Sequence, residues 1–290
     1  EMTSSLVGSE MCIRDSDKTV SNATVSMISA GAILVISVLI VLLVLVIKRW
    51  KGRFIPLALG VLSYVVFGFM FSQLLMSVLS LIPNVDQSFT YNTNAYVVIY
   101  NILLAAGFGI ARWFTAKMMT DRYNRSGDVL MAGTGLAIGD TVITYALSMF
   151  TFFVYAQAIS ANGLEKFISD MFNSGMAESD VITLYTSNVS QLVDSPAILW
   201  FLIAVSAVLD IALNIMLFMV VYGVVRKQVN YMYAYYAIIA QFVSNIMFQL
   251  YNAFSLTNII VLFIVKLVIV GGIVLFIKQF IMKEIKYSND

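Results

Sequence analysis

The sequence has no histidine, one cysteine and three prolines in 290 residues, and only 11% of its residues are charged. The missing imidazole removes the commonest metal ligand and the commonest general base at neutral pH. A single cysteine, Cys12, excludes an intramolecular disulfide. Low charge beside 60% hydrophobic residues and a mean hydropathy of +0.90 excludes a soluble globular domain. We therefore expect a polytopic membrane protein, with the lipid bilayer as a partner and no nucleic-acid partner.

The first sixteen residues are interpreted separately from the rest of the chain. Residues 6–16 (LVGSEMCIRDS) look like a translated sequencing-library adaptor, so residues 1–16 are predicted to be a non-native tail. Residues 17–290 are then a single transmembrane domain without cysteine, because Cys12 belongs to the tail. A thiol nucleophile and a thiolate metal site are excluded together with the disulfide.

Long apolar runs predict an all-α transmembrane bundle. Runs of about 20 apolar residues are long enough to cross a hydrocarbon core of about 30 Å, and seven candidates are present. The predicted spans are approximately 27–47, 54–82, 95–116, 130–158, 197–224, 231–254 and 257–277. The last two are separated only by a short polar turn at Asn252, Ser255 and Asn258.

Basic residues gather in alternate loops. They follow the first, third, fifth and last spans: Lys48, Arg49, Lys51 and Arg53; Lys117, Arg122 and Arg125; Arg226 and Lys227; Lys278, Lys283 and Lys286. The loops near 83–94 and 159–195 contain only Lys166. The positive-inside rule predicts an outer N-terminus, a cytoplasmic C-terminus and an uncleaved first span, in what we expect to be a bacterial plasma membrane.

The predicted outer loop, about 159–196, is the only long segment outside the spans. Its first half has a helical apolar face that includes Leu164, Ile168 and Phe172. Ser179 or Asp180 is predicted to cap a second helix. Two interpretations stay open: interfacial helices that pack on the bundle, or a lid over an outward-facing site.

Four ionisable residues fall inside the apolar runs: Arg112, Asp140, Asp210 and Lys266. At 1.5 Å per residue, Arg112 lies about 8 Å from the inner edge, whereas the other three lie at about 15–24 Å. Charge in hydrocarbon is costly and usually marks a functional site, but two acids and two bases also suit buried ion pairs. Arg112 is close enough to the edge to extend its charge to the interface instead.

Amide side chains accompany these charges. Asn214 follows Asp210 by one helical turn, so both share a helix face. Gln241, Asn245, Gln249 and Asn252 form a polar stripe along the predicted sixth span. Such a stripe faces other helices or water, and it also serves as ordinary interhelical hydrogen bonding.

Arg112-Trp113 at the end of the third span and the glycine-rich Gly133-Thr134-Gly135-Leu136-Ala137-Ile138-Gly139-Asp140 in the fourth resemble the YhfC-like family of membrane peptidases. That family is loosely grouped with CAAX-protease and bacteriocin-processing endopeptidases. The resemblance covers residues 20–286 and implies a peptidase-like bundle.

The residues that would carry the family's chemistry differ. The resemblance places the family's glutamate pair on Phe108 and Gly109, a motif histidine on Leu136, the last acid of the motif on Asp140, and later histidines on Asn214 and Gln241. A metal-hydroxide mechanism needs about three imidazole, carboxylate or thiolate ligands. Because two carboxylates alone lie in the spans, we expect no metal, no cofactor and no metallopeptidase activity.

Three functions remain open. The first is an inactive peptidase-like protein that binds membrane-embedded segments or lipids, with single-span proteins or peptides as partners. The second is a transporter or channel, because charges near the midplane suit a solute path. The third is a peptidase in which Asp140 and Asp210 share a proton. In each, we expect one polar interior lined by Arg112, Asp140, Asp210, Asn214, Gln241, Asn245 and Lys266.

Overall fold

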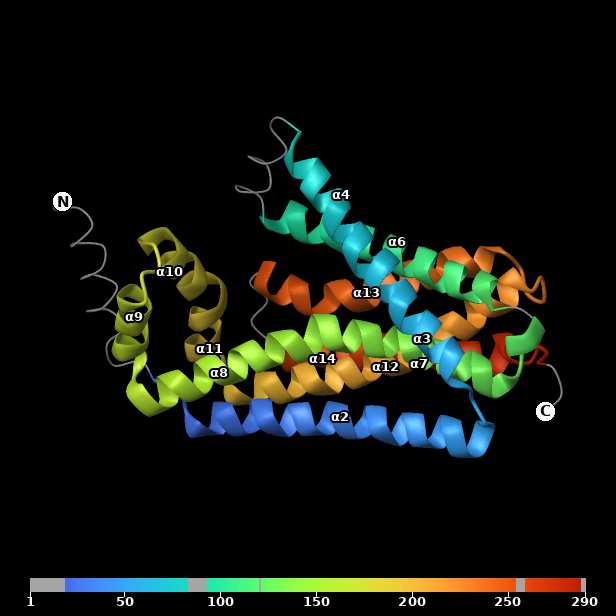
Figure 1. Ribbon diagram of the computed structural model, residues 1–290, viewed down its shortest axis with the longest axis horizontal. Helices are drawn as coiled ribbons and strands as arrows, with labels where there is room; N and C mark the ends of the chain where they lie inside the picture. The colour runs from blue at the N-terminus through green and yellow to red at the C-terminus, as the bar shows by residue number, and fades with distance from the viewer. Residues whose placement is uncertain (1–18, 83–92, 120, 254–258, 288–290) are drawn as a thin grey trace. The chain divides into compact units, whose positions relative to one another are not determined.

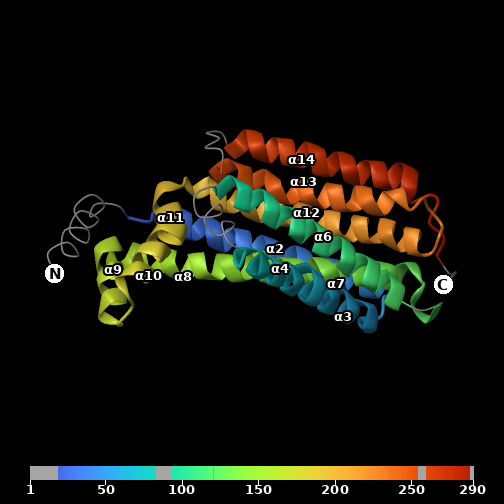
Figure 2. The same cartoon turned by 90° about the horizontal axis from the view of Figure 1, so that it is seen from above.

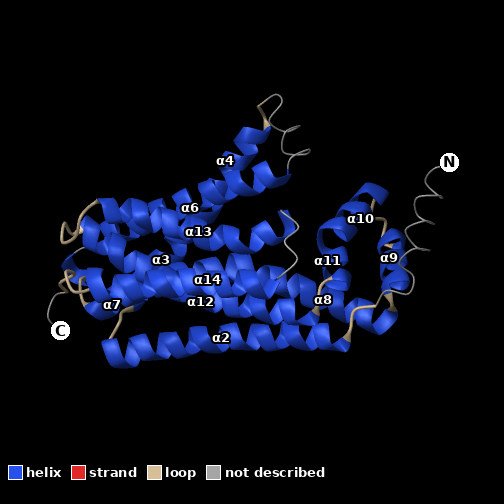
Figure 3. Cartoon of the chain, turned by 180° about the vertical axis from the view of Figure 1, so that it is seen from behind, coloured by secondary structure: helices blue, strands red, loops and turns tan. Residues whose placement is uncertain are grey.

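The computed structural model describes residues 19–82, 93–119, 121–253 and 259–287, which form helices joined by short loops (Figure 1). No strand occurs in these ranges, as the secondary-structure colouring in Figure 3 shows. The predicted all-α class is confirmed. The predicted tail, 1–16, and two residues of the predicted turn, Ser255 and Asn258, lie outside the described residues.

Six helical segments in the described part of the chain are long and apolar enough to cross a membrane. They are Asn22–Trp50, Phe54–Ser80, Ala95–Met118, Ser126–Asn162, Ala197–Val225 and Ile260–Ile281. Each corresponds to one predicted span, and the fourth is longer than predicted at both ends. The apolar runs in the sequence therefore located these helices correctly to within a few residues.

The remaining predicted span, 231–254, forms helix α13 (Met232–Ala253), which is not among those six. Its length suffices for a bilayer, but four amide side chains lower its hydropathy: Gln241, Asn245, Gln249 and Asn252. The seventh span therefore stays a prediction. A helix of this kind needs neighbours for its amide groups, because lipid tails offer no hydrogen-bond partner.

The chain divides into two compact units. Unit 1 comprises Glu1–Leu34 and Tyr145–Val205, and unit 2 comprises Val35–Thr144 and Ser206–Asp290. Predicted spans contribute to both units, so the predicted single transmembrane domain stays a prediction. The four ionisable residues singled out in the sequence, Arg112, Asp140, Asp210 and Lys266, all belong to unit 2.

Unit 2 is built around α13. This helix packs against α6 (Thr93–Met118) and α14 (Ile259–Phe276), and Figure 2 shows it between the two. Unit 2 also contains α3 (Phe54–Ser63), η1 (Tyr64–Met70), α4 (Phe71–Ser80), η2 (Asp121–Tyr123), α7 (Ser126–Asp140) and η5 (Ile277–Ile281). Parts of α2 (Asn22–Trp50), η3 (Thr141–Ala146) and α12 (Ala197–Val225) belong to it as well. The buried side chains between these helices form its core.

Helices α3 and α7 approach each other closely, and two glycines make this possible (Figure 1). A Cβ atom added to Gly60 would lie 2.2 Å from the carbonyl oxygen of Ala132. One added to Gly135 would lie 2.1 Å from the carbonyl oxygen of Leu57. Because both contacts are with backbone atoms, neither helix can accept a larger side chain there without moving.

Two π-helical segments interrupt the long spans of this unit. The first, η1, begins at Tyr64, and the second, η3, follows directly after Asp140. A π-turn contains an additional residue per turn and shifts the side chains beyond it around the helix axis. The two segments therefore set the direction of Tyr64 and Asp140 relative to the residues that follow them.

The predicted basic segments meet at one end of unit 2. Arg53 forms a salt bridge with Asp128 and donates a hydrogen bond to the backbone carbonyl of Arg122. Arg226 Nη2 donates to the backbone carbonyl of Met119 at 2.9 Å. Gln228 Nε2 donates to the carbonyl oxygen of Lys286 at 2.9 Å. These contacts join the loops after α2, α6 and α12 with the C-terminal tail.

Unit 1 contains the predicted outer loop as a series of short helices. Helix α8 (Leu147–Asn162) is followed by α9 (Leu164–Asn173), α10 (Glu178–Leu184), η4 (Tyr185–Val189) and α11 (Ser190–Asp194). Gly163, with φ of +82°, makes the sharp turn between α8 and α9. On the predicted apolar face of α9, Leu164 and Ile168 are buried but Phe172 is exposed.

The predicted cap of the second loop helix is wrong. Helix α10 begins at Glu178 after Ala177, and no side chain caps it. Ser179 and Asp180 lie inside its first turn, where Asp180 still suits the positive end of the helix dipole. The predicted cap is thus two or three residues too late in the sequence, because several polar residues precede the apolar run.

The contact between α3 and α7 leads to a test. Gly135→Ala should destabilise the protein by about 1–3 kcal/mol, because the added methyl group overlaps the Leu57 carbonyl. The measurement is thermal unfolding of the detergent-solubilised protein, followed by circular dichroism. Gly271→Ala is the control, since nothing lies within 4 Å of its Cβ position in α14. Equal unfolding temperatures for both variants would contradict the close approach.

Candidate functional site

Arg112 is the centre of a buried polar network in unit 2. It lies on α6 with its side chain completely buried. Its Nη2 atom donates to Oδ1 of Asn214 on α12 at 2.6 Å, and also to Oε1 of Gln241 on α13. The guanidinium carbon lies 5.0 Å from the ring centroid of Phe108, one turn earlier on α6. The alternative in which Arg112 extends to the interface does not fit this burial.

Asn214 connects Arg112 to the nearest carboxylate. While its oxygen accepts from Arg112, its Nδ2 atom donates to Oδ2 of Asp140 at 2.9 Å. An amide is suited to this position because it carries an acceptor and a donor on one planar group. Arg112 and Asp140 are therefore joined through Asn214 rather than by a direct salt bridge.

Two hydroxyl groups complete the surroundings of Asp140. Tyr64 Oη and Thr144 Oγ1 each donate to Oδ1 of Asp140 at 3.1 Å. The ring of Tyr64 fits between two glycines, because a Cβ atom on Gly68 or Gly139 would lie within 3 Å of a ring carbon. Glycine at these positions thus allows the tyrosine to reach the carboxylate across the helix contact.

The network continues along α13. Gln241 Nε2 donates to Oδ1 of Asn245 at 2.8 Å. Three nitrogen atoms in this chain of hydrogen bonds are buried without an acceptor in the described part of the protein: Nε and Nη1 of Arg112 and Nδ2 of Asn245. Buried donors normally have a partner, since leaving one unsatisfied costs about 1–3 kcal/mol. The network therefore has unused capacity to bind acceptor atoms.

A second group of polar residues joins α12, α13 and α14. Lys266 on α14 forms a salt bridge with Oδ2 of Asp210 at 2.8 Å, and Ser244 Oγ donates to Oδ1 of Asp210 at 2.7 Å. Lys266 is 3% exposed, and the Asp210 side chain is 23% exposed. Here the predicted ion pair between buried acid and base is present.

The structure thus brings all seven predicted site residues into unit 2, in two hydrogen-bonded groups. Arg112, Asp140, Asn214, Gln241 and Asn245 form the first, and Asp210 and Lys266 belong to the second. The groups share α12 and α13, on which their members are about one turn apart. The side chains of Gln249 and Asn252, the rest of the predicted stripe, lie outside what the structure describes.

Sequence reasoning missed Tyr64, Thr144 and Ser244. The sequence contained a signal for Thr144 and Ser244, because each lies three or four residues from a predicted site residue and therefore on the same helix face. Tyr64 had a weaker one: it lies one turn after Gly60 and one turn before Gly68 within an apolar run. That pattern indicates close packing but not the partner of the hydroxyl.

The sequence raised two routes to hydrolysis, a metal site and a pair of aspartates. Among the described residues, no three histidine, cysteine, aspartate or glutamate side chains lie together where they could hold a metal ion. A carboxylate pair that activates water must share a proton through direct contact. Asp140 and Asp210 instead have separate partners, and no hydrogen bond joins the two in the described part of the chain.

Comparison of the chain with protein-family models, with curated proteins and with solved structures found no match. The resemblance to the YhfC-like family therefore stays a prediction. What can be said of the site comes from its own geometry.

The salt bridge in the second group gives a prediction. Lys266→Met should destabilise the protein by about 3–5 kcal/mol, because Asp210 then keeps its charge without a partner. The double variant Asp210→Leu/Lys266→Met removes both charges and should recover most of the loss. Unfolding midpoints in detergent measure both effects. A double variant no more stable than Lys266→Met would contradict the pairing.

The amide of Asn214, which bridges Arg112 and Asp140, gives a second prediction. Asn214→Leu should cost about 3 kcal/mol or more, because Arg112 and Asp140 each lose a charge-assisted hydrogen bond. Thr134→Val is a matched control, since Thr134 is equally buried but donates only to Leu130 within its own helix. The comparison uses the same unfolding measurement. Similar losses for the two variants would show that Asn214 has no bridging role.

Proposed function

We propose that this chain is a multipass protein of the bacterial plasma membrane that binds membrane-embedded polypeptide segments or lipids without cleaving them. In this proposal it is an inactive member of the peptidase-like group that its sequence resembles. The observation that carries the proposal is the buried Arg112, which uses Nη2 for two amides while Nε and Nη1 have no acceptor among the residues that the structure describes. A fixed cation with unused donors can bind acceptor oxygens.

The unsatisfied donors of the network indicate which kind of ligand it can bind. Arg112 and Asn245 present only N–H donors to their surroundings, so the ligand must supply acceptor oxygens. Backbone carbonyls at an unwound part of a transmembrane segment are such acceptors, and so are the carbonyl and phosphate oxygens of lipids. In a low-dielectric interior these hydrogen bonds are stronger than in water.

Two apolar residues support the loss of hydrolysis. The resemblance places a family glutamate on Phe108 and a family histidine on Leu136. Both side chains are completely buried, one turn before Arg112 and Asp140 respectively. The positions from which metal ligands would act therefore belong to the packed core in this chain. The ring of Phe108 also contacts that of Tyr64, with centroids 5.0 Å apart.

The geometry is less favourable to the two other functions. A transporter would be expected to keep its charges accessible to water at some stage, whereas Lys266 here is closed into a salt bridge with Asp210. A peptidase based on two aspartates would need the carboxylates to face each other. Their separate hydrogen-bond partners weigh against this.

The orientation belongs to the same proposal. The loops after α2, α6 and α12 and the C-terminal tail contact one another, and these segments carry most of the predicted inner lysines and arginines. A common basic end is what the positive-inside rule requires of cytoplasmic loops. Seven spans, with the N-terminus outside and the C-terminus in the cytoplasm, account for this arrangement.

The proposal predicts ligand retention that depends on Arg112 and no hydrolysis. A single-span protein, peptide or lipid should co-purify with the tagged wild-type chain and decrease about tenfold in Arg112→Lys, because an ammonium cannot replace the planar guanidinium. Mass spectrometry of the purified sample measures this. Thr115→Val is the control on the same helix, because Thr115 is also buried but donates only to Ala111.

Two results would overturn the proposal. One is stoichiometric zinc in the purified protein. The other is cleavage of transmembrane peptides that is lost in Asp140→Asn. Solute uptake by proteoliposomes that depends on Lys266 would favour the transporter instead. In each experiment the Arg112→Lys variant must unfold at the same temperature as the wild-type protein. A loss of binding then does not reflect a loss of folding.

A further inference from the structure

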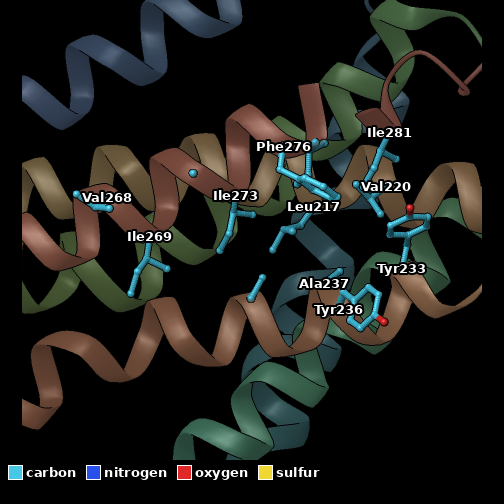
Figure 4. Close-up of a pocket in the computed structure, with 13 residues that line it drawn as sticks. Leu217, Val220, Tyr233, Tyr236, Ala237, Val268, Ile269, Ile273, Phe276 and Ile281 are labelled. Atoms are coloured by element: carbon cyan, nitrogen blue, oxygen red, sulfur yellow. The ribbon is translucent and has the colours of Figure 1, made fainter. Parts of the chain in front are cut away.

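An apolar groove lies in unit 2, separate from the residues of the polar network. It has a volume of about 430 Å³ and lies between α12, α13, α14 and η5 (Figure 4). Leu217 and Val220 line it from α12, and Ile273 lines it from α14. Figure 4 shows Val268 at one end and Tyr233 at the other, with the tyrosine hydroxyl groups as the polar atoms drawn there.

The groove opens outward. Val268 and Tyr236, which line it, are both more than half exposed in the absence of lipid. In a helix bundle that crosses a bilayer, exposed apolar side chains of this kind face hydrocarbon. Gly272 also lines the groove, and nothing lies within 4 Å of its Cβ position. The missing side chain leaves space that hydrocarbon can fill.

The volume of the groove suits a single chain of hydrocarbon better than a whole helix. A transmembrane helix is about 10 Å across and rises 1.5 Å per residue, so a segment long enough to follow the groove occupies several times 430 Å³. An extended acyl chain is much thinner. From Val268 to Ile281 the groove follows α14 and η5 for about 20 Å. That length is close to one leaflet of a hydrocarbon core about 30 Å thick.

One end of the groove, the basic end, lies close in the sequence to several lysines. Ile281 lies at the same end as Tyr233, and the exposed residues Lys278 and Lys283 flank it in the sequence. Lys227, also exposed, lies in the loop before α13. Glu284 is the acidic residue nearest in sequence, so the lysines are in excess. Tyrosine and lysine together are typical of the head-group level of a membrane, and lysine attracts anionic lipid there.

We propose that this groove binds one acyl chain of an anionic glycerophospholipid, with the head group at the basic end beside Tyr233. The apolar wall formed by α12, α13 and α14 holds the chain, and Gly272 provides the room for it. The lysines and the tyrosine hydroxyl groups hold the phosphate. The proposal goes beyond the proposed function, because it names a second binding site and uses none of the residues of the polar network.

Photolabelling in nanodiscs tests the proposal. The protein is reconstituted in phosphatidylcholine with a trace of phosphatidylglycerol that carries a diazirine on one acyl chain, and labelled peptides are identified after irradiation. Label should concentrate on α13 and α14 residues that line the groove. Gly272→Leu should decrease it about tenfold, because the new side chain fills the space of two or more methylene groups.

Gly271→Leu is the matched control. It introduces the same side chain into the same helix at a position with equally open space, but Gly271 does not line the groove. Labelling should be unchanged in this variant, and in wild type it should be weaker when the diazirine is on phosphatidylcholine. Three results would overturn the proposal. The two leucine variants could be labelled equally, or the two lipids could label the wild-type protein equally. The third result is a crosslink between two copies of the chain through α13 and α14. Arg112→Lys should keep its label, which separates failure here from failure of the network.

Discussion

The structure of unit 2 depends on one constraint: a charge inside a membrane bundle must meet a compensating group, because lipid tails provide none. The protein meets this requirement in two ways. Lys266 and Asp210 pair directly, whereas Arg112 and Asp140 are joined through the amide of Asn214. Both arrangements require α12 to lie in one register relative to its neighbours. The hydrogen bonds therefore specify which helix faces meet, and the apolar surfaces fill in around them.

Close packing and the polar network depend on each other. Gly60 and Gly135 allow α3 and α7 to touch through their backbones, and this contact brings η1 beside the end of α7. The Tyr64 hydroxyl can then reach Asp140. Without the glycines the helices would separate by the width of a side chain. The carboxylate would then lose one of its three donors.

The sequence was sufficient for the positions of six long apolar helices and for the list of charges inside them, because hydropathy and charge depend on composition along one helix. It was not sufficient for the partners. Nothing in the spacing of Arg112 and Asp140 indicates that an amide lies between them, since that depends on the rotation of three separate helices. Tyr64 was missed for the same reason. Phe108 was recognised only as a replacement for an acid, and its contact with the guanidinium needed coordinates.

The polarity of α13 has a consequence for how the chain is made. A helix with four amides gains little from entering hydrocarbon alone, and the Asp210 and Lys266 helices on either side each carry a charge that opposes insertion by about 3 kcal/mol. Gln241 and the charges of Asp210 and Lys266 find their partners only when α6, α12, α13 and α14 are together. The translocon would therefore have to retain α12 until α14 has been synthesised, and release the C-terminal helices into the bilayer as a group.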